Sequence, residues 1–159
     1  MNNIYLLLGS NIGDSKKQLS GAVKHIQKKI GKPTRRSQLY ATAAWGKTDQ
    51  PDFLNQVIKV ETKLTSIETM GAILAIEKEM GRVRTEKNAP RIIDIDILFF
   101  NKEIINEHNL VVPHPQVQNR RFVLVPLNEL SPNFKHPVFQ QSIHYLLEKC
   151  KDHLDVKKF

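Results

Sequence analysis

Cysteine is almost absent from this sequence, since Cys150 is the only one among 159 residues. A single cysteine excludes an intramolecular disulfide and a zinc site built from several cysteines. The sequence also lacks an apolar run long enough to span a membrane, and its N-terminus has no signal-peptide pattern. We therefore expect a cytoplasmic protein with no membrane partner, folded around an ordinary hydrophobic core.

Two common phosphate-binding motifs are also missing. Neither the G-x-x-x-x-G-K-[ST] loop nor the G-x-G-x-x-G fingerprint occurs in the chain. Residues 9–14 do form a glycine-containing turn between an apolar run and a helical pattern. We interpret this segment as a tight turn in which Asn11 or Asp14 caps the helix. Repeats and low-complexity linkers are absent too, so we expect one domain, residues 1–159.

The charge is biased toward basic residues, with 24 lysines and arginines against 16 acidic residues and a formal net charge of +8. A basic balance favours an anionic partner, which would be either a nucleic acid or a phosphorylated small molecule. The alternative is that the positive charge only serves solubility. Charge alone does not choose between these interpretations.

The most informative stretch is residues 91–100, where apolar and polar side chains alternate. The alternation predicts a β-strand with its apolar residues on one face, namely Ile93, Ile95, Ile97 and Phe99. Asp94 and Asp96 then share the opposite face, with Cβ atoms roughly 7 Å apart. Two carboxylates placed in this way can hold a hard cation such as Mg²⁺. The alternative is the solvated face of an edge strand, but the apolar character of the strand predicts a central place in the sheet.

A basic segment, residues 81–91, directly precedes this strand. It is too polar for a core and is predicted to be a loop, and its arginines are Arg82, Arg84 and Arg91. Arginines bind phosphate oxygens in a bidentate manner, although a solvated loop would have the same composition. Carboxylates for a metal beside arginines for phosphates are the components of a phosphoryl-transfer site, so their adjacency favours a functional site.

Hydrophobic periodicity predicts an α+β fold. The order of elements is strand, helix, strand, strand, helix, strand, which is typical of the ferredoxin-like βαββαβ core, an antiparallel sheet with helices on one face. A C-terminal α/β extension is predicted to follow this core. The predicted strands are residues 4–8, 36–42, 53–63 and 91–100, and the predicted helices are residues 15–30, 65–80, a short one from 123, and 141–149.

Other side chains suggest a ligand with a flat ring. Phe53 and Asn55 lie at i and i+2 of a strand, where an aromatic ring and an amide can contact a heteroaromatic ring. The only tryptophan, Trp45, lies in the preceding loop. Ordinary strand packing would explain the same residues.

Two polar residues need partners that the sequence does not identify. Glu77 falls on the predicted buried stripe of helix 65–80, together with Ile67 and Leu74, and an unpaired buried carboxylate is costly. It either pairs with a basic residue or helps to form a polar site. His114 lies between two prolines near Arg120 and is compatible with an anion-contacting role, although most single histidines are structural.

Taken together, these motifs resemble the 6-hydroxymethyl-7,8-dihydropterin pyrophosphokinase family of folate biosynthesis. The resemblance covers essentially the whole chain. It is carried by Gly9-Ser10-Asn11, by DQPDFLN at 49–55, by Gly81-Arg82-Val83-Arg84, by APRIIDIDIL at 89–98, and by Val112-Pro113-His114 with NRRF at 119–122.

The resemblance implies transfer of the β,γ-pyrophosphoryl group of ATP to the pterin hydroxymethyl group. It implies ATP and 6-hydroxymethyl-7,8-dihydropterin as partners, with two Mg²⁺ ions as cofactors held by Asp94 and Asp96. The implied catalytic residues are Arg82, Arg91, Asp94 and Asp96. The implied ATP-binding residues are Glu77, Arg82, Arg84, Arg91, Ile97, His114 and Arg120, and the implied pterin-binding residues are Thr42, Ala43, Trp45, Phe53, Asn55 and Phe122.

The sequence departs from the pattern common in this family at Leu74, at Asn88, where many members have a nearby aromatic, and at Pro115-Gln116. Two other functions use similar features. A ferredoxin-like RNA-binding module would need the RNP pattern of sheet aromatics, which is absent. A two-metal nuclease would use the same carboxylates. We expect a monomer with no nucleic-acid partner.

Overall fold

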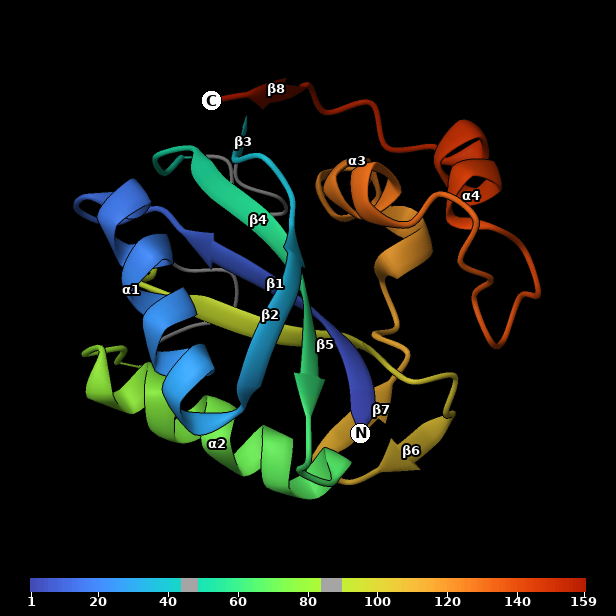
Figure 1. Cartoon of the computed structure of the whole chain (residues 1–159). Coiled ribbons are helices and arrows are strands. Elements are labelled where there is room, and N and C mark those ends of the chain that lie inside the picture. The colour runs from blue at the N-terminus through green and yellow to red at the C-terminus, as the bar shows by residue number, and fades with distance from the viewer. Residues whose placement is uncertain (44–48, 84–89) are drawn as a thin grey trace.

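The computed structural model describes residues 1–43, 49–83 and 90–159, which form a mixed α/β fold (Figure 1). In this part of the chain the main sheet is antiparallel throughout, in the order β5-β1-β4-β3-β8, and β2 also pairs with β4. The antiparallel sheet and the flanking helices agree with the predicted α+β class. The strands of this sheet are β1 (Asn2–Ser10), β2 (Gly31–Arg36), β3 (Tyr40–Thr42), β4 (Phe53–Thr62), β5 (Asp94–Phe100) and β8 (Val156–Lys158).

Helices cover both faces of this sheet. Two of them, α1 (Ser15–Lys29) and α2 (Ser66–Glu79), pack on one face, while α3 (Arg121–Leu130) and α4 (Ile143–Lys149) pack on the other (Figure 1). The prediction of helices on one face concerned α1 and α2, which do share a face, and it did not place α3 and α4. A small hairpin of β6 (Ile105–Glu107) and β7 (Leu110–Val112) and a 3₁₀ turn, η1 (Val117–Asn119), lead from β5 to α3.

The central strand, β1, divides the core into two apolar clusters. Ile4, Leu6 and Leu8 belong to the cluster under α1 and α2, whereas Tyr5 and Leu7 belong to the cluster under α3 and α4. A strand that is buried on both faces needs apolar residues at every position, which explains the near-continuous apolar run in the sequence. None of the described helices is long and apolar enough to cross a membrane.

The aspartate strand lies at the edge of the sheet, which corrects the prediction of a central place. Within the described chain β5 pairs only with β1, and its apolar character comes from helices that cover both of its faces. The predicted alternation is also interrupted, because a register shift places Ile97 opposite Leu6 and Phe99 opposite Tyr5. Leu98 is the extra residue of β5 at this shift, and it turns the side chain of Phe99 into the cluster under α3.

Two further predictions about local structure were wrong. One strand was predicted over residues 36–42, but the structure has two, β2 and β3. The chain enters β2 at Gly31, directly after α1, which is earlier than predicted. Gly31 allows this close approach, since a Cβ atom there would lie 1.9 Å from the carbonyl oxygen of Glu61. On α2 the predicted capping box, between Thr65 and Glu68, is present. The buried stripe is shifted, however, and is formed by Thr69, Ile73, Ile76 and Glu77, while Ile67 and Leu74 are exposed.

Candidate active site

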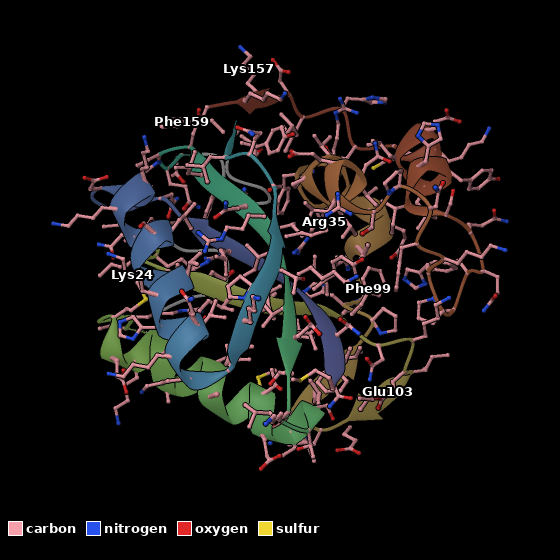
Figure 2. All side chains as sticks on the ribbon, in the orientation of Figure 1. Lys24, Arg35, Phe99, Glu103, Lys157 and Phe159 are labelled. Atoms are coloured by element: carbon pink, nitrogen blue, oxygen red, sulfur yellow. The ribbon has the colours of Figure 1, made fainter. Side chains whose placement is uncertain are left out.

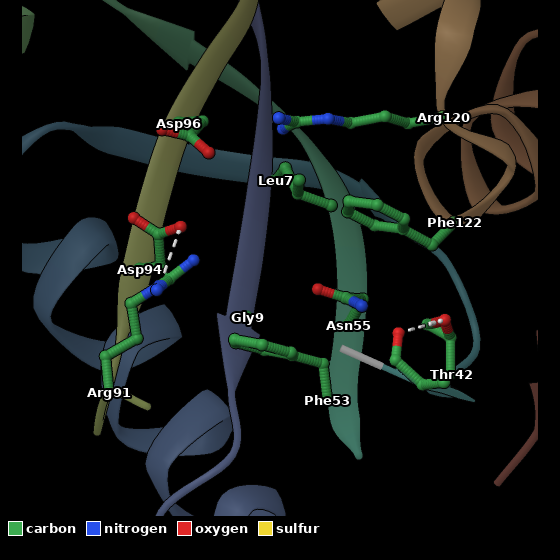
Figure 3. A pocket seen from close by; sticks show the side chains of 11 residues that line it. Leu7, Gly9, Thr42, Phe53, Asn55, Arg91, Asp94, Asp96, Arg120 and Phe122 are labelled. Atoms are coloured by element: carbon green, nitrogen blue, oxygen red, sulfur yellow. Dashed lines mark hydrogen bonds and ion pairs between the residues drawn. The ribbon is translucent and has the colours of Figure 1, made fainter. Parts of the chain in front are cut away.

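One pocket gathers most of the predicted site residues on the face of the sheet that α3 covers (Figure 3). It lies where the apolar cluster under α3 ends and polar residues replace apolar ones on β1, β4 and β5. Two cross-strand pairs at this level, Gly9 with Asp94 and Gly9 with Asn55, place the three residues side by side across the sheet. The residues that line the pocket are Leu7, Gly9, Thr42, Ala43, Phe53, Asn55, Arg91, Asp94, Asp96, Arg120 and Phe122.

The two carboxylates point into this pocket from β5 (Figure 3). Asp94 pairs with Gly9 and Asp96 with Leu7 on the neighbouring strand, so both side chains project from the same face. Burial raises the pKa of Asp96 to about 7, and the charges of Asp94 and Glu77 act in the same direction, while Arg120 and Arg82 oppose them. Asp96 is therefore only partly ionised near neutral pH, and a nearby cation would favour its charged form.

Arg82 connects the carboxylate site to helix α2. Its Nη1 atom donates to Glu77 Oε2 at 2.6 Å and to Asp94 Oδ1 at 2.8 Å. Glu77 is buried and also accepts a hydrogen bond from the Ile95 backbone N–H at 2.9 Å. Burial raises the pKa of Glu77, whereas Arg82 and the Ile95 N–H lower it. Of the two alternatives for Glu77, pairing with a basic residue is thus observed, and the pair lies at the margin of the site.

Two arginines each lie over an aromatic ring of the pocket. The guanidinium carbon of Arg91 is 5.0 Å from the ring centroid of Phe53, and its Nε atom is 3.3 Å from Asp94 Oδ2. The guanidinium carbon of Arg120 is 5.7 Å from the ring centroid of Phe122. Both contacts are within the range of cation–π interactions. The pocket is therefore bounded by two rings and two positive charges, with the carboxylates of β5 on a third side.

Asn55 lies between the two rings in the view of Figure 3 and is buried. Its Nδ2 atom has no hydrogen-bond partner in the described part of the chain. A buried amide N–H without a partner is costly, which suggests that a ligand supplies the acceptor. Gly9 makes room for this amide, because a Cβ atom at position 9 would lie 2.7 Å from Asn55 Oδ1.

His114 is held in a neutral form next to the site. Its Nδ1 atom accepts a hydrogen bond from the Gln116 backbone N–H at 3.1 Å. Burial, and then the positive charge of Arg120, lower the pKa of His114 to about 4. A neutral imidazole that accepts at Nδ1 carries its proton on Nε2. His114 is therefore a hydrogen-bond donor at neutral pH rather than a positive charge.

The remaining predicted residues lie in different places. Thr42 and Ala43 line the pocket at the end of β3. Ile97 is buried in the cluster under α1 and α2, on the opposite face from the carboxylates, so its side chain does not line the pocket. Trp45 and Arg84 fall outside the described residues, as do the departures at Lys87-Asn88-Ala89.

Asn11 is a site-adjacent residue that the sequence interpretation missed. The helix cap of α1 is Asp14, not Asn11. Asn11 is buried and donates through Nδ2 to Gln50 Oε1 at 2.7 Å and to the Pro51 carbonyl at 3.0 Å. Its Oδ1 atom accepts from the Arg91 backbone N–H at 2.9 Å. It thus joins the segment before β4 to the segment before β5. The position of Asn11 directly after the central strand was the available clue.

The donor set is compatible with a hard cation that has additional ligands from a substrate. Among the described residues, no group of three or more His, Cys, Asp or Glu side chains could hold a metal ion. Asp94 and Asp96 supply carboxylate oxygens only, and Mg²⁺ is commonly bound by one or two carboxylates together with substrate phosphates and water. The raised pKa of Asp96 has the same implication, since a nearby cation would relieve the repulsion between the carboxylates.

Comparisons with known proteins identify one family. The family model for 7,8-dihydro-6-hydroxymethylpterin-pyrophosphokinase (HPPK) matches residues 5–132. A 2-amino-4-hydroxy-6-hydroxymethyldihydropteridine pyrophosphokinase of Methylorubrum extorquens is 44% identical over 134 residues, which are 84% of this chain and 85% of that protein. A protein of the same name from Haemophilus influenzae is 36% identical over 154 residues, 96% of each chain.

Longer proteins also match. The Folic acid synthesis protein fol1 of Pneumocystis carinii is 41% identical over 154 residues, which are 97% of this chain and 21% of that protein. The chain thus spans about a fifth of this relative. Among solved structures, an HPPK-DHPS of Plasmodium falciparum has a TM-score of 0.78 and 21% identity, and the match covers 93% of this chain and 44% of that chain. This likeness shows the same fold.

The raised pKa of Asp96 leads to a prediction about titration. In the unfolded chain this carboxyl group titrates near 3.8, so its charging opposes folding as the pH rises from about 4 to about 7. We expect ¹³C NMR of the metal-free protein to give an Asp96 midpoint near 7, and Asp94→Asn to lower it because a neighbouring negative charge is removed. A midpoint near 4 in the wild-type protein would contradict this electrostatic description.

Proposed function

The chain belongs to the 7,8-dihydro-6-hydroxymethylpterin-pyrophosphokinase family, and we propose that it transfers the β,γ-pyrophosphoryl group of ATP to the hydroxymethyl oxygen of 6-hydroxymethyl-7,8-dihydropterin. AMP is the second product, and the reaction belongs to folate biosynthesis. The observation that carries this proposal is the composition of one pocket. An aromatic and amide side for a flat ring adjoins two carboxylates and two arginines for the phosphates.

The pterin ring binds between Phe53 and Phe122 in this proposal. The unpartnered Nδ2 of Asn55 donates to an acceptor on the ring edge, which satisfies a buried amide and fixes the orientation of the ring. Thr42 and Ala43 form the adjoining wall, and we assign Trp45 to the same wall from the sequence. The hydroxymethyl group then points toward β5, because the carboxylates lie on that side of the pocket.

The triphosphate binds on the basic side. Arg82 and Arg91 both pair with Asp94, so their charges are collected at the position where phosphates would enter. Arg120 adds a charge from the start of α3, and neutral His114 donates a hydrogen bond to an oxygen. The other residues that we assign to ATP are Arg84, Glu77 and Ile97. Glu77 acts by holding Arg82, and the buried Ile97 side chain supports from the opposite face the strand that carries the aspartates.

The reaction forms a bond between the pterin oxygen and the β-phosphorus and breaks the bond between that phosphorus and the oxygen that leaves with AMP. Asp94 and Asp96 would hold Mg²⁺, with two ions expected from the family pattern. The bound metal would neutralise phosphate charge and lower the pKa of the attacking hydroxyl group. Arg82 and Arg91 stabilise the negative charge that develops on AMP. The proton of the hydroxyl group passes to solvent, because no side chain in the described pocket is placed as a dedicated base.

The finer features of the fold belong to the same proposal. The order β5-β1-β4-β2 with α1 and α2 on one face supports a ferredoxin-like core, to which α3, α4 and β8 form a C-terminal extension. Since both apolar clusters share β1, we treat residues 1–159 as a single pyrophosphokinase domain. We further propose a cytoplasmic monomer with no nucleic-acid partner.

The activity is tested by measuring AMP release from ATP with and without the hydroxymethyl-dihydropterin, in the presence of Mg²⁺. We expect AMP only when both substrates and Mg²⁺ are present. Asp96→Ala should lower turnover by at least about 10³-fold, because a carboxylate that positions the metal is lost. The matched control is Glu107→Gln on β6, an exposed acidic residue, which should keep wild-type turnover. Pterin-independent cleavage of nucleic acid would contradict the proposal and support the nuclease.

Gly9 provides a test of the pterin side. Gly9→Ala places a methyl group against Asn55 Oδ1, so the amide must move away from the ring position. We expect the dissociation constant of the pterin to rise about tenfold, which corresponds to the loss of one hydrogen bond. Gly71→Ala is the control, since a Cβ atom there meets nothing within 4 Å. Unchanged pterin binding in Gly9→Ala, measured by fluorescence titration, would show that Asn55 does not contact the ligand.

A further inference from the structure

The segment after α4, residues 152–159, contacts two separate walls of the pocket, and we refer to it as the C-terminal strap. It passes α3 and then runs beside β3 (Figure 1). Both elements carry residues assigned to the pterin, namely Phe122 on α3 and Thr42 on β3. The family model ends at residue 132, so the strap lies beyond the matched region.

The first contact of the strap is made at the start of α3. The Oδ2 atom of Asp152 accepts a hydrogen bond from the Arg121 backbone N–H at 3.0 Å. The N-cap residue of α3, Arg120, makes no side-chain capping bond. A carboxylate supplied by a distant segment therefore satisfies a first-turn N–H and interacts favourably with the positive end of the helix. Arg121 lies between Arg120 and Phe122, so this bond fixes the backbone from which both pocket side chains project.

Asp152 is itself held in place. Its second oxygen, Oδ1, accepts from the Leu154 backbone N–H at 3.0 Å. One carboxylate oxygen thus bonds to the helix, and the other bonds within the strap and fixes the orientation of the side chain. The side chain is partly buried, which protects these bonds from competition with water.

The second contact of the strap is made with β3. Val156 pairs with Thr42, Lys157 with Ala41 and Lys158 with Tyr40. The pairing continues in the Phe159 backbone N–H, which donates to the Leu39 carbonyl at 2.9 Å. A strand of three residues is short, and β8 gives it a second hydrogen-bonded neighbour beside β4. The backbone that presents Thr42 and Ala43 is thereby held from both sides.

A direct bond between α3 and β3 completes the arrangement. Tyr40 Oη donates to Glu129 Oε1 at 2.6 Å, and Glu129 also accepts from the Gln38 backbone N–H. Tyr40 pairs with Asn55 on β4, so this bond lies in the same row of the sheet as the amide of the pocket. Helix, strand and strap are therefore joined in pairs around the ring-binding side.

We propose that Asp152 is a positioning residue for the pterin, acting through the start of α3 and together with β8. The inference rests on the proposed function, because it concerns the substrate of that reaction. If the strap is released, the wall with Phe122 and the wall with Thr42 lose their fixed separation, and a smaller fraction of the protein is competent to bind the ring. Binding of ATP depends less on the strap, because among the described arginines assigned to ATP only Arg120 lies beside a bond of the strap, whereas Arg91 and the two aspartates lie on and before β5.

The test compares Asp152→Ala, Asp152→Asn and a deletion of residues 156–159 with the wild-type chain. We expect Asp152→Ala and the deletion to raise KM for the pterin about tenfold while KM for ATP changes by less than about twofold, in keeping with the loss of a helix cap. Asp152→Asn should recover most of the affinity, because its amide oxygen can still accept from the Arg121 N–H. Glu148→Ala on α4 is the control, since this exposed carboxylate pairs with His144.

A purely structural role would lower the amount of folded enzyme and leave both KM values unchanged, and that result would overturn the proposal. Equal increases in both KM values would also overturn it. If Asp152→Ala does not fold, the deletion of residues 156–159 decides the outcome by the same comparison. Hydrogen exchange gives a readout that does not depend on turnover, because release of the strap should speed exchange at residues 40–43 and 121–124 but not in β1. A wild-type chain without pterin-dependent AMP release would instead contradict the proposed function.

Discussion

The repulsion between two aspartates at the edge of a buried sheet is the constraint on which the rest of the site depends. Asp94 and Asp96 project from one face of β5, where burial and the charge of Asp94 both oppose ionisation of Asp96. Three arginines compensate these negative charges. Arg82 and Arg91 form ion pairs with Asp94, and the charge of Arg120 favours the ionised form of Asp96. The same arginines are those proposed to bind the phosphates, so the charges that compensate the aspartates also suit the site to ATP.

This electrostatic arrangement is held by apolar packing on both faces of the sheet. On one face the isoleucines of β5 pack under α1 and α2, and on the other Leu7 and Val57 pack under α3. The pocket begins on the second face where that packing ends. Side chains over the whole molecule are drawn in Figure 2, with Lys24 of α1 and Arg35 of β2 among those labelled.

Much of the fold was predictable because its signals are local. The capping box at Thr65 and Glu68 and the alternation in β5 depend on neighbours in the sequence, and they gave a correct helix start and correctly oriented carboxylates. The edge position of β5, the turn of Phe99 into the other cluster, and the exposure of Ile67 and Leu74 could not be read locally. They depend on where α3 and the β6–β7 hairpin pack, which is decided by residues far along the chain.

The residues of the site also divide into those that a local sequence pattern identifies and those that only the folded structure reveals. Aspartates, arginines and the Phe53–Asn55 pair carry chemistry in their side chains, so a pattern could identify them. Asn11 and Gly9 act through partners on other strands, and only the register of β1 with β4 and β5 reveals those partners. The neutral state of His114 likewise follows from burial and from Arg120, not from its place between prolines.

The central claim is that Asp94 and Asp96 hold metal between the two substrates, and a crystal structure with Mg²⁺, a non-hydrolysable ATP analogue and the pterin tests it most directly. We expect metal–oxygen distances of about 2.1 Å to both carboxylates, with the pterin between Phe53 and Phe122 and hydrogen-bonded to Asn55. A structure in which both ligands are bound but the metal contacts neither aspartate, or in which the pterin lies outside this pocket, would contradict the account.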